Sequence, residues 1–202
     1  MTAGPGPNLI LLASGSPQRR ALLESIGLPF RVVVSGVDEV GDAAANARDK
    51  ARAVAASHGI PPGGAVLGAD TQVLAGGRVF EKPADAAEAR AMLTALSGGW
   101  HEVATAVHLI AGSGEHALRD VARVRFRRLA PAAVDWYLAT GEWRGRAGGY
   151  AVQLSGAALV ERIEGDYTTV VGLPLGALVG LLEAVGLAPW SGTPSGGAAT
   201  LS

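Results

Sequence analysis

Residues 9–27 read LILLASGSPQRRALLESIG, and this stretch predicts a buried strand that leads directly into a helix. The apolar run 9–13 is typical of a buried strand, and the Ser-Gly-Ser sequence that follows ends it. Ser16 is a favourable N-cap, Pro17 suits the first helical position, and Gly27 is a stop signal. The chain therefore begins with a strand–turn–helix unit, which confines it to folds that combine a sheet with helices.

Arg19 and Arg20 fall in the first turn of this helix. A cation is unfavourable there by roughly 0.3–1 kcal/mol, because the helix dipole is positive at that end. Two arginines beside free backbone N–H groups favour an anion site, and phosphate is the usual anion. The alternative is that both arginines are solvated surface residues. We expect the phosphate site.

Strand and helix patterns alternate along the rest of the chain without a strict βαβ repeat, which favours a mixed sheet over a purely parallel one. Strands are predicted at 9–13, 30–34, 65–74, 78–81, 100–110, 121–129, 150–153, 157–163 and 168–171. Helices are predicted at 17–26, 42–58, 89–96, 131–138 and 174–182. Gly76-Gly77 is predicted to form the tight turn between two strands.

Composition excludes several classes of protein. The 202 residues include no cysteine, so disulfides and thiolate metal sites are excluded, and a reducing cytoplasm is expected. A formal net charge of −1 gives no field that would attract a nucleic acid polymer. The first residues lack the pattern of a secretory signal, and no apolar run reaches about 18 residues, so no membrane association is expected.

The length and the pattern of strands and helices, with no linker between them, predict a single domain over residues 8–190. Residues 1–7 are expected to be disordered. The small and polar tail 191–202 is expected to be disordered as well, because it lacks apolar residues to bury.

Asp70 lies inside a run of small and apolar residues, LGADTQVL, that reads as a strand. Burying an unpaired carboxylate costs several kcal/mol, so this residue needs a partner, a metal ion or a chemical role. The alternative is an Asp at a strand end that caps a turn. Asp38 and Glu39 follow an earlier strand and complete an acidic trio, and Mg²⁺ typically takes one or two carboxylates and completes its shell with phosphates and water.

The seventeen basic residues include only two lysines, Lys50 and Lys82. A lysine retained against such an arginine bias is expected where a compact point charge is needed. Together with the acidic trio and Arg19, the two lysines make up the parts of a phosphate-transfer site.

Several competing motifs are absent from the sequence. No lysine follows a glycine, so there is no Walker P-loop, and neither a GxSxG elbow nor HExxH spacing occurs. His101 is expected to be structural rather than catalytic. Trp143 lies in a basic, glycine-rich loop at 141–149. The alternatives for this loop are that it stacks on or clamps a nucleotide, or that it is a hinge, and stacking by Trp143 is not favoured.

Six stretches in order resemble the Maf family, the nucleoside triphosphate pyrophosphatases also called septum formation inhibitors. They are LASGSPQRRALLESIGLPF, LGADTQV, EKP, LSGGWHEVATAV, AGGYAVQ and EGDYTTVVGLPL. The resemblance covers roughly residues 9–186. It implies an α/β fold with a mixed, strongly twisted central sheet flanked by helices, in two lobes with a cleft, similar to inosine triphosphatase. It also implies hydrolysis of a nucleoside triphosphate to the monophosphate and pyrophosphate with a divalent cation, Mg²⁺ or Mn²⁺.

The resemblance carries over residue by residue. Asp70 matches the proton acceptor that would activate water, and it is expected to share metal binding with Glu39. The positions expected to hold phosphates and assist catalysis are Ser14, Arg19, Lys50 and Lys82. The positions linked to base choice are Gln18, Thr71 and Gln153.

Thr71 and Gln153 agree with the branch that acts on dTTP and UTP. Gln18 departs from both branches, which carry Arg or Trp at this position, so the exact nucleotide preference stays open. The expected partner is a small-molecule nucleotide, and a homodimer is left open.

Three functions are weighed. The first is the pyrophosphatase. The second is a nucleotide-binding regulator of cell division without significant turnover, and the third is a sugar- or dinucleotide-binding enzyme on a Rossmann-like core, which no GxGxxG motif supports. Asp70 together with Lys82 and Arg19 favours chemistry over binding alone.

Overall fold

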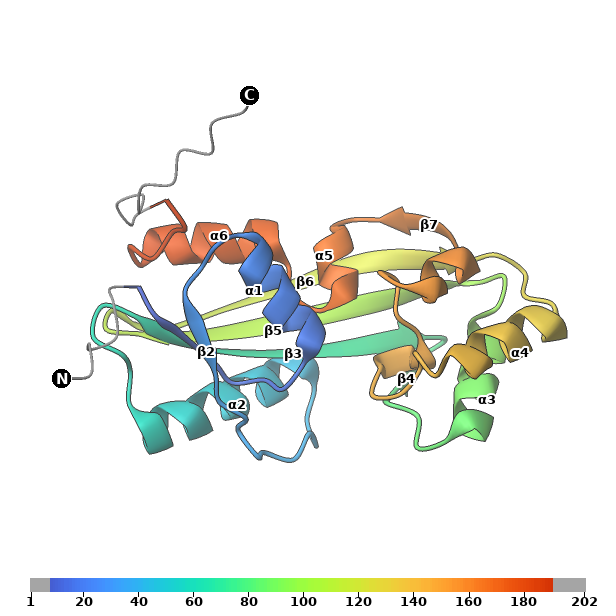
Figure 1. The fold of residues 1–202 in the computed structure, drawn as a ribbon, viewed down its shortest axis with the longest axis horizontal. Helices are drawn as coiled ribbons and strands as arrows, with labels where there is room; N and C mark the ends of the chain where they lie inside the picture. Colours follow the sequence, from blue (N-terminus) through green and yellow to red (C-terminus); the bar gives the residue numbers. More distant parts are fainter. Residues whose placement is uncertain (1–7, 191–202) are drawn as a thin grey trace, which may run out of the picture.

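The computed structural model describes residues 8–190, which form a seven-stranded mixed sheet flanked by helices (Figure 1). The strand order is β2-β1-β3-β5-β6-β7, and β4 pairs with β3 beside this path. Only β1 pairs in parallel, with β2 and β3, whereas the other described pairings are antiparallel. The strands are β1 Ile10–Leu12, β2 Phe30–Val32, β3 Ala65–Ala75, β4 Arg78–Phe80, β5 Trp100–Ala111, β6 Gly114–Phe126 and β7 Val160–Glu164. The mixed sheet predicted from the sequence is confirmed. The disorder predicted for 1–7 and 191–202 concerns residues outside the described range.

Within residues 8–190, six α-helices and two short 3₁₀ turns surround the sheet. They are α1 Pro17–Ser25, α2 Ala43–His58, α3 Ala86–Leu96, α4 Pro131–Thr140, α5 Tyr167–Val171, α6 Leu175–Ala184, and the turns η1 Ala147–Gly149 and η2 Ser155–Leu159. Among the described residues, none of these helices is long and apolar enough to cross a membrane.

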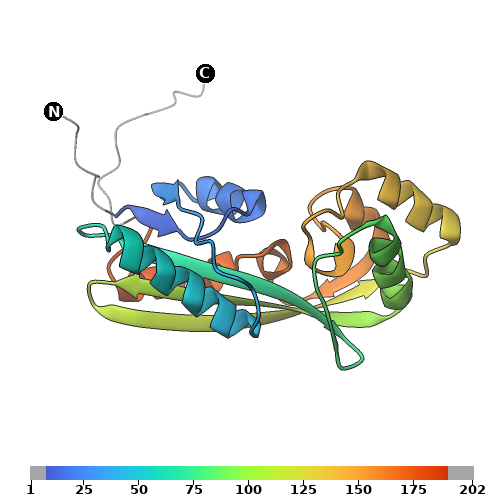
Figure 2. The ribbon, with the colours of Figure 1, turned by 90° about the horizontal axis from the view of Figure 1, so that it is seen from below.

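Alternation along β3 decides which helices cover which face, because successive side chains of a strand point to opposite faces. Leu67 packs with α1 and α6 on one face, whereas Val66 packs with α2 on the other. Farther along the strand, Val73 lies on the same face as Leu67 and packs with α3 and α4. Two groups of helices therefore stand on one face of the same long strands, and Figure 2 shows them as two lobes with the strands running beneath both.

A gap in hydrogen-bonded pairing marks the middle of β3. On one side of this strand, β1 pairs with residues 65–67 and β4 pairs with residues 73–75. Between them, residues 68–72 have no strand neighbour on that side within the described part of the chain, although β5 continues along the other side. The loops that follow β1, β2 and β4 are free to converge on this gap.

Two of the predicted strands are wrong, a third begins too early and a fourth begins too late. Residues 168–171 belong to α5, because the Asp166 side chain caps the N-terminus of that helix by accepting from the backbone N–H of Thr168. Residues 150–153 lie between the two 3₁₀ turns, where the Tyr137 hydroxyl accepts from the backbone N–H of Ala151. The strand predicted at 157–163 begins as η2 and becomes β7 only at Val160. Strand β6 begins at Gly114, earlier than residue 121, because its first residues pair with β5.

Candidate active site

A cavity of about 450 Å³ opens at the gap in β3 and is lined by both lobes. The first lobe contributes the loop after β1 and the start of α1. The second contributes the loop that joins α4 to η1. Four cations and two carboxylates line the cavity: Arg19, Lys82, Arg144, Arg146, Glu39 and Asp70. This excess of positive charge suits an anionic ligand.

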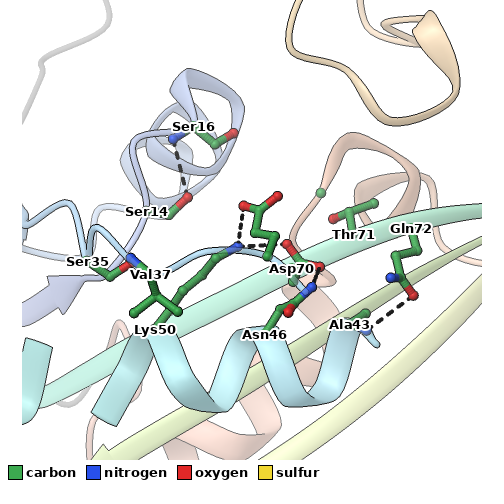
Figure 3. A network of polar contacts seen from close by, with 12 residues as sticks. Ser14, Ser16, Ser35, Val37, Ala43, Asn46, Lys50, Asp70, Thr71 and Gln72 are labelled. Atoms are coloured by element: carbon green, nitrogen blue, oxygen red, sulfur yellow. Dashed lines mark hydrogen bonds and ion pairs between the residues drawn. The ribbon is translucent and has the colours of Figure 1, made fainter. Parts of the chain in front are cut away.

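Asp70 is buried, and both of its carboxylate oxygens are held from α2 (Figure 3). Lys50 Nζ donates to Oδ1 at 2.7 Å, and Asn46 Nδ2 donates to Oδ2 at 3.0 Å. A carboxylate has about four acceptor positions, so two remain for other donors. The prediction that Asp70 needs a partner is confirmed, and the alternative of a turn cap is wrong.

The close approach of α2 to β3 depends on Gly68. A Cβ atom added at this glycine would lie 2.1 Å from the carbonyl oxygen of Ala47 and 2.8 Å from the backbone nitrogen of Ala51. No side chain fits there, so the helix packs directly against the strand and brings Asn46 and Lys50 to Asp70. Sequence reasoning missed Asn46, although its position four residues before Lys50 places both on one helix face.

Glu39 joins the two lysines that the sequence singled out. Its carboxylate accepts from Lys50 Nζ at 2.7 Å and from Lys82 Nζ at 2.5 Å. Burial, the largest single influence, raises the pKa of Glu39, but the hydrogen bonds and charges of Lys50 and Lys82 together outweigh it and lower the pKa to about 2. Glu39 is therefore ionised at neutral pH.

Arg19 lies in the floor of the cavity rather than in solvent. Its side chain donates to Ser14 Oγ at 2.9 Å, to Thr71 Oγ1 at 3.1 Å and to the carbonyl oxygen of Gly172 at 2.9 Å. Burial lowers its pKa, and the charges of Asp70 and Glu39 raise it. The alternative of a solvated surface residue is wrong for Arg19.

The hydroxyl of Thr71 is engaged in hydrogen bonds with Arg19 and Thr105. Thr105 Oγ1 donates its proton to the carbonyl oxygen of Thr169, so the 2.9 Å contact between the two threonine hydroxyls is donated by Thr71. Since Thr71 Oγ1 also accepts from Arg19, its hydroxyl can accept one more hydrogen bond but has no proton left to donate. Thr71 thus orients Arg19.

Two predicted members of the site lie elsewhere. Arg20 is exposed and pairs with Glu24 one turn along α1, because its side chain points away from the sheet. Asp38 is exposed and does not line the cavity, so the acidic trio is reduced to Glu39 and Asp70. Within residues 8–190, no group of three or more His, Cys, Asp or Glu side chains gathers as a cation site.

Gln18 and Gln153 both line the cavity, from opposite lobes. Gln18 Oε1 accepts from Ser16 Oγ at 3.1 Å and from Arg146 Nη1. Trp143, in contrast, is buried in the second lobe and donates from Nε1 to the carbonyl oxygen of Leu138, so the disfavoured alternative that it stacks on a nucleotide is excluded.

His101 is buried behind the cavity wall, as expected of a structural residue. Its Nε2 hydrogen-bonds the hydroxyl of Tyr150 at 2.8 Å, and Tyr150 itself lines the cavity. Burial lowers the pKa of His101 to about 4, so the ring is neutral at neutral pH.

The chain is similar to known proteins over most of its length. Residues 9–185 match the family model described as Maf-like protein. The chain is 47% identical over 191 residues to the dTTP/UTP pyrophosphatase of Myxococcus xanthus, covering 90% of this chain and 95% of that one. It is 45% identical over 194 residues to the dTTP/UTP pyrophosphatase of Deinococcus radiodurans, with 93% and 97% covered. It is 42% identical over 195 residues to the enzyme of the same name in Hahella chejuensis, with 93% and 97% covered.

Proposed function

Because this chain belongs to the Maf family, we propose that it is a nucleoside triphosphate pyrophosphatase that acts on dTTP and UTP. The reaction is hydrolysis between the α- and β-phosphates, which gives the monophosphate and pyrophosphate. The three relatives reported above all carry a pyrophosphatase name, and this favours turnover over a regulator that only binds nucleotide.

The observation that carries the proposal is the arrangement around Asp70. Its carboxylate faces a cavity lined with cations, and Lys50 and Asn46 fix it while leaving acceptor positions free. We assign Asp70 as the proton acceptor for the attacking water. A positioned general base contributes about 10²–10⁴-fold to a rate.

The cations have separate roles in this proposal. Arg19 and Ser14 bind the phosphate chain at the start of α1, where backbone N–H groups also favour anions. Lys82 is half-exposed at the cavity, and within residues 8–190 it forms an ion pair only with Glu39, so it can contact the phosphates that carry the leaving charge. Lys50 is buried and keeps Asp70 and Glu39 in place.

The donor set fits a divalent cation. Glu39 and Asp70 offer hard oxygen ligands on either side of Lys50, and Glu39 stays ionised as a ligand must. We propose that these two carboxylates hold Mg²⁺ or Mn²⁺, with the phosphates and water as the other ligands. When bound, the ion neutralises charge on the phosphates.

We propose that Gln153, which lines the cavity from the second lobe, reads the base. Gln153 has both an amide donor and an acceptor for the edge of a pyrimidine. Thr71 contributes through Arg19, because its hydroxyl has no free proton. Gln18 is neutral and supplies no charge for base selection, so we propose that Thr71 and Gln153 mainly determine the pyrimidine preference. The cytoplasmic location and the homodimer left open by the sequence stay predictions.

Product analysis tests the function. The full chain is incubated with UTP or dTTP and Mg²⁺, and phosphorus NMR identifies the products. Monophosphate and pyrophosphate are expected, and EDTA should abolish their formation. Formation of the nucleoside diphosphate with orthophosphate, or full activity in EDTA, would contradict the assignment. Nucleotide binding without any product would favour the regulator.

A further inference from the structure

Arg146 reaches across the cleft. It lies in the loop between α4 and η1 in the second lobe, and its Nη1 donates to Oε1 of Gln18, which is in the first turn of α1. The two residues are 128 positions apart in the sequence, and both line the cavity. This hydrogen bond therefore spans the space in which a ligand would lie.

The charge of Arg146 is not matched by a carboxylate. Lys50 and Lys82 each form ion pairs, but within residues 8–190 no carboxylate lies within ion-pair distance of Arg146. Its Nε is buried without a hydrogen-bond partner. Burial lowers the pKa of Arg146, while Tyr137 and Glu142 act in the opposite direction from farther away. A half-buried guanidinium with a neutral amide as its partner is poorly stabilised.

The place to which Arg146 points adds to this cost. The first turn of α1 presents backbone N–H groups and the positive end of the helix dipole. Arg19 lies in the same turn, and within residues 8–190 none of its hydrogen bonds goes to a carboxylate, although the charges of Asp70 and Glu39 act on it. Arg146 thus faces two positive features of α1 across the cavity, and an anion that enters between them is favoured.

We propose that Arg146 is a substrate-binding residue that donates to a phosphate oxygen of the nucleotide and leaves Gln18 when it does so. This inference rests on the proposed function, because it takes the anion to be the triphosphate of a bound nucleotide. Gln18 holds the guanidinium in the cavity through a neutral acceptor, which a phosphate oxygen can displace. A hydrogen bond from the guanidinium to a charged phosphate oxygen is stronger than one from the same guanidinium to a neutral amide oxygen.

Gln18 is suited to this exchange because it bears no charge. A glutamate at the same position would form an ion pair with Arg146 and compete with phosphate. An alanine would release Arg146 without adding a competitor. The effect of a charge at position 18 should therefore depend on whether residue 146 is an arginine.

The test compares Arg146→Met with Arg128→Met, which removes one charge from an exposed arginine outside the cavity. We measure KM for UTP and dTTP, and the inhibition constant of inorganic tripolyphosphate, with Mg²⁺ present. Arg146→Met should raise all three values by roughly 10- to 100-fold, the range expected for a lost hydrogen bond to a charged group. Arg128→Met should leave them unchanged, and thermal unfolding should show both variants folded.

Gln18→Glu supplies a second test. It should weaken tripolyphosphate binding in the parent by several-fold more than it does in the Arg146→Met background. Equal effects in both backgrounds would overturn the exchange between Gln18 and Arg146. Unchanged tripolyphosphate inhibition in Arg146→Met, with only the preference between bases altered, would overturn the phosphate contact. A parent that turns over no nucleotide yet loses tripolyphosphate binding in Arg146→Met would contradict the proposed function alone.

Discussion

Asn46 and Lys50 lie one turn apart on α2, and each donates a hydrogen bond to a different oxygen of the Asp70 carboxylate. The helix therefore fixes the plane of the carboxylate as well as its position. Asp70 has the same parity along β3 as Val66, so its side chain points to the face of the sheet that α2 covers, and it lines the cavity where β3 lacks a neighbouring strand on one side.

Asp70→Asn should keep the fold and nucleotide binding but lower kcat by about 10²–10⁴-fold, because an amide cannot accept a proton from water. Single-turnover assays with UTP measure the loss. Asp135→Asn, an exposed acid on α4, is the matched control and should keep full activity. Turnover within a few-fold of the parent would make Asp70 structural and leave Glu39 as the candidate base.

Lys50→Met should destabilise the protein by about 3–5 kcal/mol. It removes the cation between Asp70 and Glu39 and leaves the buried Asp70 carboxylate without its ion-pair partner. Urea unfolding at neutral pH measures this change. Lys82→Met should cost under about 1 kcal/mol, since that side chain is 49% exposed. Equal losses in the two variants would contradict a buried role for Lys50.

Gly68→Ala should lower both stability and kcat, because the new methyl group would push α2 away from β3 and carry Lys50 and Asn46 with it. Overpacking of this kind costs about 1–3 kcal/mol. Gly112→Ala is the control, since nothing lies within 4 Å of a Cβ added there. If Gly68→Ala keeps the parent melting temperature and kcat, the contact is not needed to place the carboxylate.

The buried His101 should make the protein sensitive to acid. Its pKa falls from 6.5 to about 4 on folding, so the unfolded chain takes up a proton first as the pH drops. The contribution of His101 to the free energy of unfolding is constant above pH 6.5. It falls between pH 6.5 and 4, by up to about 3 kcal/mol.

Urea midpoints across this pH range check the prediction. They should fall less steeply in His101→Gln than in the parent. His58→Gln, an exposed substitution of the same kind, should keep the parent slope. Parallel slopes for all three proteins would show that another group titrates.

Gln153→Glu should lower kcat/KM for UTP and dTTP, because a carboxylate loses the amide donor to a base carbonyl and repels phosphate. The values for UTP, dTTP, CTP and 7-methyl-GTP measure base choice. Gln72→Glu is the control, since Gln72 lies outside the cavity and caps α2 with an oxygen that a glutamate also has. An unchanged UTP value in Gln153→Glu would show that this side chain does not read the base.

Local patterns predicted the regular elements well where they coincide with clear end signals. Ser16 caps α1 and Gly59 ends α2 as such signals require. The pattern failed at residues 168–171, since threonine and valine favour strands by propensity, yet the Asp166 cap and packing make them a helix. Residues 150–153 failed because side chains such as Tyr137, distant in sequence, satisfy their backbone groups.

The charged residues of the site could be named from the sequence, but their pairing could not. Residue types and the family resemblance indicated Asp70, Lys50 and Arg19. Nothing local showed that Arg20 points into solvent while its neighbour Arg19 points inward, since this depends on how α1 lies on the sheet. Arg146 escaped notice as a single residue because its contact with Gln18 exists only once the lobes are assembled.

Strands β3, β5 and β6 run without interruption beneath both lobes (Figure 2). Two lobes joined by a flexible loop could rotate about a hinge. Here three continuous hydrogen-bonded strands join the lobes and resist bending between them. The width of the cleft is therefore set when the sheet folds. Entry of a nucleotide therefore depends on movements of side chains and short loops at the rim of the cleft, which are faster than collective bending of the sheet.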